Sequence, residues 1–135
     1  MGIVRGRRAG AYVNFSIGTL ENGRIDDVEA ISIDEDDFYY IYQVVVKNYP
    51  AFDLYDLVNP ISEGKVQSII WDLEAIQEWM QNGESFEAIS YYIQWLSNET
   101  MIPAIEERIA FFDELIEYLH GIQEFDFDYL NLQGF

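Results

Sequence analysis

The clearest structural signal in the chain lies at residues 103–120, which read PAIEERIAFFDELIEYLH. Proline favours the first turn of a helix, and Gly121 follows as a residue type that commonly ends one. At 100° per residue the apolar side chains form two stripes, one through Phe112 and one through Leu115, and acidic side chains fill the remaining sector. A helix with two apolar stripes packs on two sides, so we expect 103–120 to be the central helix.

Further helices are expected on either side of this signal. Ser32 and Glu35 match a capping box and predict a helix from residue 33 that stops before Pro50. Apolar residues at helical spacing predict a second helix over 64–82, and a third follows a cap at Ser85. The segment between Pro50 and the second helix is expected to be a loop with one short turn.

The start of the chain has a different pattern. Val13, Phe15 and Ile17 alternate with polar residues, which is the period of a strand, and Asn22-Gly23 is a hairpin turn signal. Residues 28–33 would supply the return strand. The fold class expected from the whole pattern is mostly α, a compact helical bundle-like domain to which an N-terminal β-hairpin is a possible addition.

Charge divides the chain in two. Residues 1–24 carry four arginines against one glutamate, a net +3, whereas the remaining 111 residues carry 24 acidic side chains against three basic ones, a net −21. We therefore expect a basic N-terminal arm over 1–10, poorly ordered or loosely docked, and a single acidic domain over 11–135. Such a surface repels nucleic acid and anionic membranes and attracts basic proteins.

Composition excludes several classes of protein. The 135 residues are 16% aromatic, too rich for a disordered acidic tail, and they include no cysteine, which excludes disulfides and thiolate chemistry. No apolar run approaches the ~18 residues of a membrane span, and no secretory signal precedes the first predicted strand. We expect a cytoplasmic protein.

Metal and catalytic motifs are incomplete. Glu117 and His120 have Glu-x-x-His spacing, but a carboxylate-bridged di-iron site needs two such pairs and the chain has one histidine. The acidic runs that start at Asp34 and at Glu124 lack the glycine and glutamate of a calcium-binding EF-hand loop. No nucleophile motif or phosphate-binding loop is present. We therefore expect no enzyme, no cofactor and no metal site.

Aromatic residues near the acidic clusters have two interpretations. Trp71, Tyr91 and Trp95 lie opposite the main apolar stripes of their helices, so they either complete a second buried face or anchor a partner. Residues 124–129 alternate acid with aromatic. If extended, this segment would dock its aromatics and display Glu124, Asp126 and Asp128; otherwise it is a frayed acidic tail.

In size, acidity and lack of cysteine the chain resembles the small immunity proteins of bacterial toxin–immunity systems, of the contact-dependent inhibition or nuclease bacteriocin type. The resemblance implies a protein that binds and neutralises a basic toxin domain, here a nuclease, by covering its active-site cleft. The alternatives are a nucleic-acid mimic that inhibits a DNA-binding enzyme and a non-enzymatic adaptor. The predicted partner-binding residues are Asp34, Glu35, Asp36, Asp37, Tyr40, Tyr91, Trp95, Glu124, Asp126 and Asp128.

Overall fold

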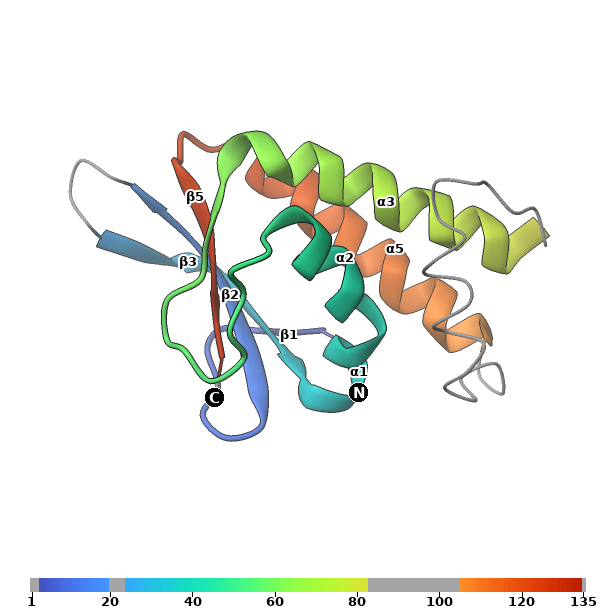
Figure 1. Cartoon of the computed structure of the whole chain (residues 1–135), viewed down its shortest axis with the longest axis horizontal. Helices are drawn as coiled ribbons and strands as arrows, with labels where there is room; N and C mark the ends of the chain where they lie inside the picture. The colour runs from blue at the N-terminus through green and yellow to red at the C-terminus, as the bar shows by residue number, and fades with distance from the viewer. Residues whose placement is uncertain (1–2, 20–23, 83–104, 135) are drawn as a thin grey trace.

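An antiparallel sheet of five strands organises the chain in a computed structural model that describes residues 3–19, 24–82 and 105–134 (Figure 1). The strand order is β1-β3-β2-β5-β4. The strands are β1 (Ile3–Arg5), β2 (Tyr12–Thr19), β3 (Arg24–Asp34), β4 (Pro60–Ser62) and β5 (Tyr129–Gln133). The prediction of a mostly helical bundle is therefore wrong, and the protein has an α/β fold.

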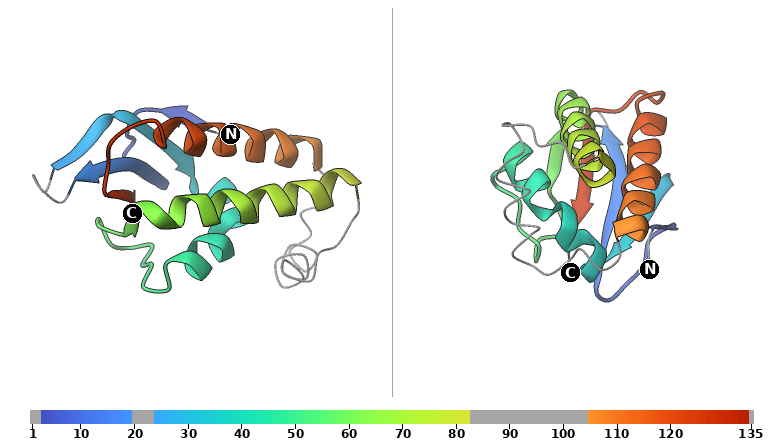
Figure 2. Two further views of the ribbon diagram at one scale, coloured as in Figure 1. Left: turned by 90° about the horizontal axis from the view of Figure 1, so that it is seen from above. Right: turned by 90° about the vertical axis from the view of Figure 1, so that its right-hand side faces the viewer.

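Helices cover one face of this sheet (Figure 2). They are α1 (Glu35–Phe38), the 3-10 turn η1 (Tyr39–Ile41), α2 (Tyr42–Asn48), α3 (Glu63–Asn82) and α5 (Ile105–Ile122). Within the described ranges, α3 lies between α2 and α5 and contacts both. The middle helix of the layer is thus α3, not the predicted 103–120 segment.

The expected apolar stripes of α3 and α5 are buried nevertheless. Val66, Ile70 and Leu73 of α3 are fully covered, as are Phe112 and Leu115 from the two stripes of α5. The second stripe of α5 reaches the sheet. Tyr118 shows this, since its ring meets the ring of Phe15 and its hydroxyl donates to the Glu29 carbonyl at 2.7 Å. Burial raises the pKa of Tyr118 far above its usual value.

The two paired strands of the predicted N-terminal hairpin are confirmed and are longer than expected, whereas its predicted turn at Asn22-Gly23 lies outside the described residues. β2 pairs with the eleven-residue β3, with Phe15 opposite Ile31 and a register shift between Phe15 and Ile17. The alternation seen in the sequence places Val13, Phe15 and Ile17 in the core. Asn14 is also buried, and its side chain exchanges two hydrogen bonds with the Arg8 backbone.

Part of the predicted basic arm belongs to the sheet. Ile3–Arg5 pairs with β3, with Ile3 opposite Ile33, and Ile3 packs against the core. The expectation of a poorly ordered or loosely docked arm is wrong for these residues, because two β-branched side chains can add to the β3 edge. Gly6 and Gly10 follow at φ 87° and 96°, values that glycine adopts readily, and return the chain to β2.

The predicted helix start at Ser32 is wrong. β3 continues to Asp34, whose carboxylate accepts a hydrogen bond from the Asp37 backbone N–H at 2.9 Å and so caps α1. Ser32 pairs with Val4 and Asn14 in the sheet, and this non-local pairing outweighs the local capping motif. The expected helix is divided into α1, η1 and α2, and α2 ends before Pro50 as predicted.

The remaining predictions have mixed outcomes. The helix over 64–82 is confirmed as α3, and 103–120 corresponds to α5. The predicted helix after Ser85, with Tyr91 and Trp95, lies outside the described residues. Strand β5, which lies between β2 and β4 in the sheet, was not predicted. Over the described ranges, no helix combines the length and the apolar character needed to cross a lipid bilayer.

Candidate protein-binding site

An aromatic cluster joins α1, α2 and the loop that follows them. The ring of Phe38 lies 5.6 Å from that of Phe52, and Tyr42 meets both rings edge-on at 6.3 and 5.9 Å. Phe38 and Phe52 are buried and Tyr42 is half-buried. These rings lie beneath a groove of about 700 Å³. Its lining residues are Glu35, Phe38, Tyr39, Tyr42, Ala51, Phe52, Asp53, Leu54 and Tyr55.

Two exposed aromatic side chains line this groove, and two more exposed apolar side chains follow on the same loop. Tyr39 is 45% exposed and Tyr55 is 78% exposed, and both line it. Leu57 and Val58 continue the same loop and are more than half exposed. These are four of the six large hydrophobic side chains that are exposed in the described ranges. Because single exposed apolar residues are common but clusters are not, this surface is a candidate for protein binding.

Carboxylates accompany the exposed rings. Glu35 and Asp53 line the groove and are exposed, and Asp36 and Asp56 are exposed beside them in sequence. The Asp53 Oδ1 accepts a hydrogen bond from the Tyr55 N–H at 2.9 Å, and the Asp56 Oδ1 accepts one from the Val58 N–H at 3.2 Å. Each carboxylate therefore shapes the backbone that presents its apolar neighbour.

Buried Asn59 fixes the loop of residues 50–59 internally. Its Oδ1 accepts a hydrogen bond from the Asp53 N–H at 2.9 Å, and its Nδ2 donates to the Asp53 carbonyl at 2.9 Å. The same Nδ2 donates to the Leu132 carbonyl at 2.8 Å. Asn59 is 1% exposed, so these bonds form away from water and hold the 50–59 loop against β5.

Asn131 of β5 and the following Gly134 also hold the loop. The Asn131 Oδ1 accepts a hydrogen bond from the Asn59 N–H at 2.8 Å, and the Asn131 Nδ2 donates to the Leu57 carbonyl at 3.2 Å. The Gly134 N–H donates to the Asp56 carbonyl at 2.9 Å. Figure 1 shows this loop passing from α2 back to β4 beside β5. The exposed Tyr55, Leu57 and Val58 therefore lie on a loop whose backbone is held by hydrogen bonds.

The predicted acidic cluster at 34–37 does not present four equivalent carboxylates. Asp34 caps α1, and Asp37 is buried and bonded to the Arg108 Nη1 at 2.8 Å. The Arg108 guanidinium lies 3.6 Å above the centre of the Tyr40 ring. Burial raises the pKa of the Tyr40 hydroxyl above its usual value, although the adjacent guanidinium acts in the opposite direction. Glu35 and Asp36 are the exposed members of the cluster.

The second predicted cluster lies elsewhere. Glu124, Asp126 and Asp128 are exposed as expected, but only part of the predicted aromatic docking occurs, since Phe127 is buried and Phe125 is 47% exposed. Residue 129 pairs with Gly18 and residue 34 pairs with Tyr12, at opposite ends of β2. At ~3.3 Å per residue the clusters are separated by roughly 20 Å along the strand, and the structure does not bring them into one site.

Trp71 is 65% exposed on α3, so it does not complete a second buried face of this helix.

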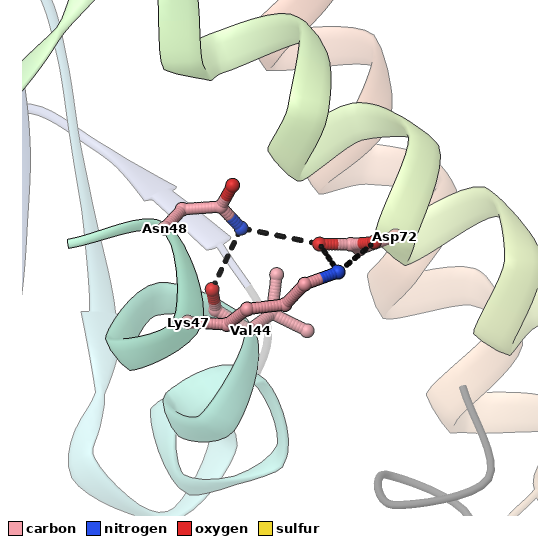
Figure 3. Close-up of polar contacts among 4 residues, drawn as sticks. All are labelled: Val44, Lys47, Asn48 and Asp72. Atoms are coloured by element: carbon pink, nitrogen blue, oxygen red, sulfur yellow. Dashed lines mark hydrogen bonds and ion pairs between the residues drawn. The ribbon is translucent and has the colours of Figure 1, made fainter. Parts of the chain in front are cut away.

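Asp72, the next residue, has a structural role (Figure 3). Its carboxylate accepts hydrogen bonds from the Lys47 Nζ at 3.1 and 3.2 Å and from the Asn48 Nδ2 at 3.1 Å. Asn48 also donates to the Val44 carbonyl at 2.9 Å. These contacts fix α2, which carries Tyr42 of the groove, to α3.

No metal-binding cluster is found in the described residues. Within these ranges no group of three or more histidine, cysteine, aspartate or glutamate side chains could hold a metal ion. Glu117 and His120 are both exposed on α5. Comparisons with protein-family models, with curated proteins and with solved structures find no match to the chain.

Tyr39, Tyr55, Leu57 and Val58 were not among the predicted site residues. A signal for three of them is present in the sequence, since Tyr55-Asp56-Leu57-Val58 places apolar residues in a predicted loop between two prolines. Such residues have no helix or strand period that would bury them. Their exposure, and the approach of Tyr39, depend on how the loop packs.

Proposed function

We propose that this protein is an inhibitor of the immunity type that binds a basic toxin domain, a nuclease, and covers its active-site cleft. The observation that carries the proposal is the groove between α1 and the 50–59 loop. There the exposed rings of Tyr39 and Tyr55 lie beside the carboxylates of Glu35 and Asp53.

The charge of the chain supports a basic partner. A formal net charge of −18 exceeds in magnitude the ~2–8 that suffices for solubility of a small domain. Opposite charge on a partner raises the association rate, and a nuclease cleft that binds phosphates supplies such charge. Carboxylates at the rim of the groove would act mainly in this encounter step.

The exposed aromatic rings would supply binding affinity, which charge alone does not provide. Tyrosine is enriched among the residues that dominate protein–protein affinity, especially where its ring enters a desolvated pocket. The backbone around Tyr55 is held by Asp53 and Asn59 before any partner arrives. Such preorganisation lowers the entropy lost on binding. Tyr55 is therefore expected to slow dissociation, whereas Glu35 and Asp36 act on association.

The partner can be identified at this surface by site-specific crosslinking. A photo-reactive phenylalanine analogue replaces Tyr55 in one variant and Trp71 in another, so that both probes sit at exposed aromatic positions. We expect the probe at 55 to capture a basic protein whose toxicity is abolished by co-expression of the wild-type chain. Capture from position 71 alone would place the interface on α3 instead.

Charge reversal then tests the site with a matched control. Glu35→Lys with Asp36→Lys changes exposed carboxylates beside the groove, and Glu124→Lys with Asp126→Lys makes the same change in net charge at the opposite end of β2. The first pair should slow association with the captured partner by about tenfold or more at low salt and weaken protection in cells.

The second pair should have a smaller effect, since it alters only the long-range field. Equal effects from the two pairs would contradict the proposed site. If the protein inhibits a DNA-binding enzyme in competition with DNA and no basic toxin is captured, the nucleic-acid mimic replaces the inhibitor proposed here. Asp34 and Asp37 are left unchanged because they hold α1 in place.

A further inference from the structure

The groove beside α1 combines two chemical features that together select one kind of side chain. Phe38 and Phe52 make its lower part apolar, and the rings of Tyr39, Tyr42 and Tyr55 line it further. Glu35 and Asp53 add negative charge to the same lining. A purely apolar ligand would remove both carboxylates from water without supplying a compensating positive charge, and an anion would be repelled.

We propose, on the basis of the proposed function, that this groove receives an arginine side chain of the basic partner. A guanidinium is planar and weakly hydrated, so it stacks on an aromatic face while its N–H groups donate to carboxylates. The three methylene groups of the side chain can cover the apolar lower part of the groove. The ammonium group of lysine is not planar and lacks the forked arrangement of N–H donors.

An arginine already binds a carboxylate and an aromatic ring within the protein, on the segment formed by α1 and η1. Asp37 and Tyr40 are three residues apart, and the Arg108 guanidinium bonds to the first at 2.8 Å and stacks on the second at 3.6 Å. Glu35 and Tyr39, four residues apart, present a second carboxylate and ring that line the groove. Residues at these spacings are neighbours on a helical surface. Arg108 stacks on and bonds to the internal pair, and we propose that an arginine from outside meets the pair that lines the groove.

The size of the groove agrees with this occupant. Its volume of about 700 Å³ falls within the roughly 300–1,000 Å³ of sites that hold drug-sized ligands. An arginine with its flanking backbone fits this range. Tyr55 lines the groove and is 78% exposed, so a partner that enters the groove can reach its ring.

The inference can be tested with the protein alone. The probes are three blocked tripeptides with a central arginine, citrulline or lysine between glycines. Each is titrated into labelled protein while backbone amide NMR signals are followed. The arginine peptide should shift the signals of Glu35, Tyr39, Asp53 and Tyr55, and it should bind about tenfold or more tightly than the neutral citrulline peptide, as expected for the loss of charge-assisted hydrogen bonds.

Isosteric variants test the carboxylates. Glu35→Gln with Asp53→Asn removes two charges, and the new amide oxygen at position 53 can still accept from the Tyr55 N–H. Glu124→Gln with Asp126→Asn removes the same charge near the end of β2 opposite to the 34–37 cluster. The first variant should weaken arginine-peptide binding about tenfold and the second less than about twofold. Unchanged amide spectra elsewhere verify the fold.

Three results would overturn the inference: equal binding of the arginine and citrulline peptides, equal binding of the lysine peptide, or arginine-induced shifts outside the groove. None of them requires the partner. The proposed function is tested separately by the charge-reversal pairs against the captured toxin. Protection that depends on Glu35 and Asp36, without arginine binding in the groove, would therefore reject this inference and retain the inhibitor.

Discussion

Asp36 and Asp37 are adjacent in the sequence and have opposite surroundings. Asp36 is exposed at the start of α1, whereas Asp37 is 4% exposed and bonded to Arg108. The Arg108 side chain is itself 18% exposed and stacks on Tyr40, so the pair lies in a region from which most water is excluded. Removing one member of such a pair leaves the other charge without compensation. Only one of the two neighbouring carboxylates therefore supports the fold.

This contrast predicts unequal effects of the same substitution. Asp37→Ala should lower the free energy of unfolding by about 2–3 kcal/mol, because the Arg108 guanidinium loses its carboxylate in a largely desolvated place. Asp36→Ala should change it by about 0.5 kcal/mol or less, as for most surface substitutions. Chemical denaturation measures both. Similar values for the two variants would show that the Asp37–Arg108 pair contributes little.

At the scale of elements, β5 links the sheet to the candidate site. It pairs with β2 on one side and β4 on the other, so it lies inside the sheet although it is close to the end of the chain. Asn131 in β5 and Gly134 just after it hold the 50–59 loop by hydrogen bonds. A side chain at Gly134 would overlap the Leu54 carbonyl, which is backbone and cannot rotate away. Glycine is thus required by close approach of the loop.

Two glycine substitutions test this packing. Gly134→Ala should destabilise the protein by about 1–3 kcal/mol and increase hydrogen exchange in the 50–59 loop, because the loop must move to admit the methyl group. Gly121→Ala in α5 is the control, since apart from its chain neighbours and the adjacent backbone of α5 nothing lies within 4 Å of the added carbon. That change should stabilise by roughly 0.5 kcal/mol through helix propensity. An unchanged free energy of unfolding in Gly134→Ala would mean that the loop can move to admit the methyl group without loss of stability.

The whole molecule is governed by its excess of negative charge. The formal net charge is −18, and the acidic clusters at 34–37 and 124–128 lie at opposite ends of β2. Exposed like charges repel within a compact domain, and salt screens them over ~10 Å at 0.1 M. Buried pairs such as Asp37–Arg108 are screened less. Stability should therefore increase when salt is added.

The corresponding prediction concerns the melting temperature. It should rise as sodium chloride is increased from about 10 to 150 mM, since screening relieves repulsion in the folded state. Glu124→Gln with Asp126→Asn should flatten this dependence slightly by removing two of the exposed charges. Differential scanning calorimetry on both proteins provides the comparison. A melting temperature that falls steadily with salt would show that favourable ion pairs outweigh the repulsion.

Local patterns in the sequence were sufficient to predict the elements whose buried face is formed by regularly spaced apolar residues. The apolar spacing around Leu73 predicted α3, and the two stripes through Phe112 and Leu115 predicted α5. The alternation around Phe15 predicted the strand of the hairpin. Composition alone established the acidic character that underlies the proposed function. Each of these signals involves residues close in sequence, whose side chains fall on one face of one element.

Contacts between distant segments decided the rest. β1 and β5 are short and become strands because β3 and β2 offer them backbone partners, so the fold class could not be predicted from helix periodicity. The same holds for the site. The sequence indicated the acids at 34–37, but Arg108 turned Asp37 inward, and the bonds of Asn59 to β5 placed Tyr55 beside α1. Hydrogen bonds and ion pairs that span many residues leave no local period, and only the folded chain reveals them.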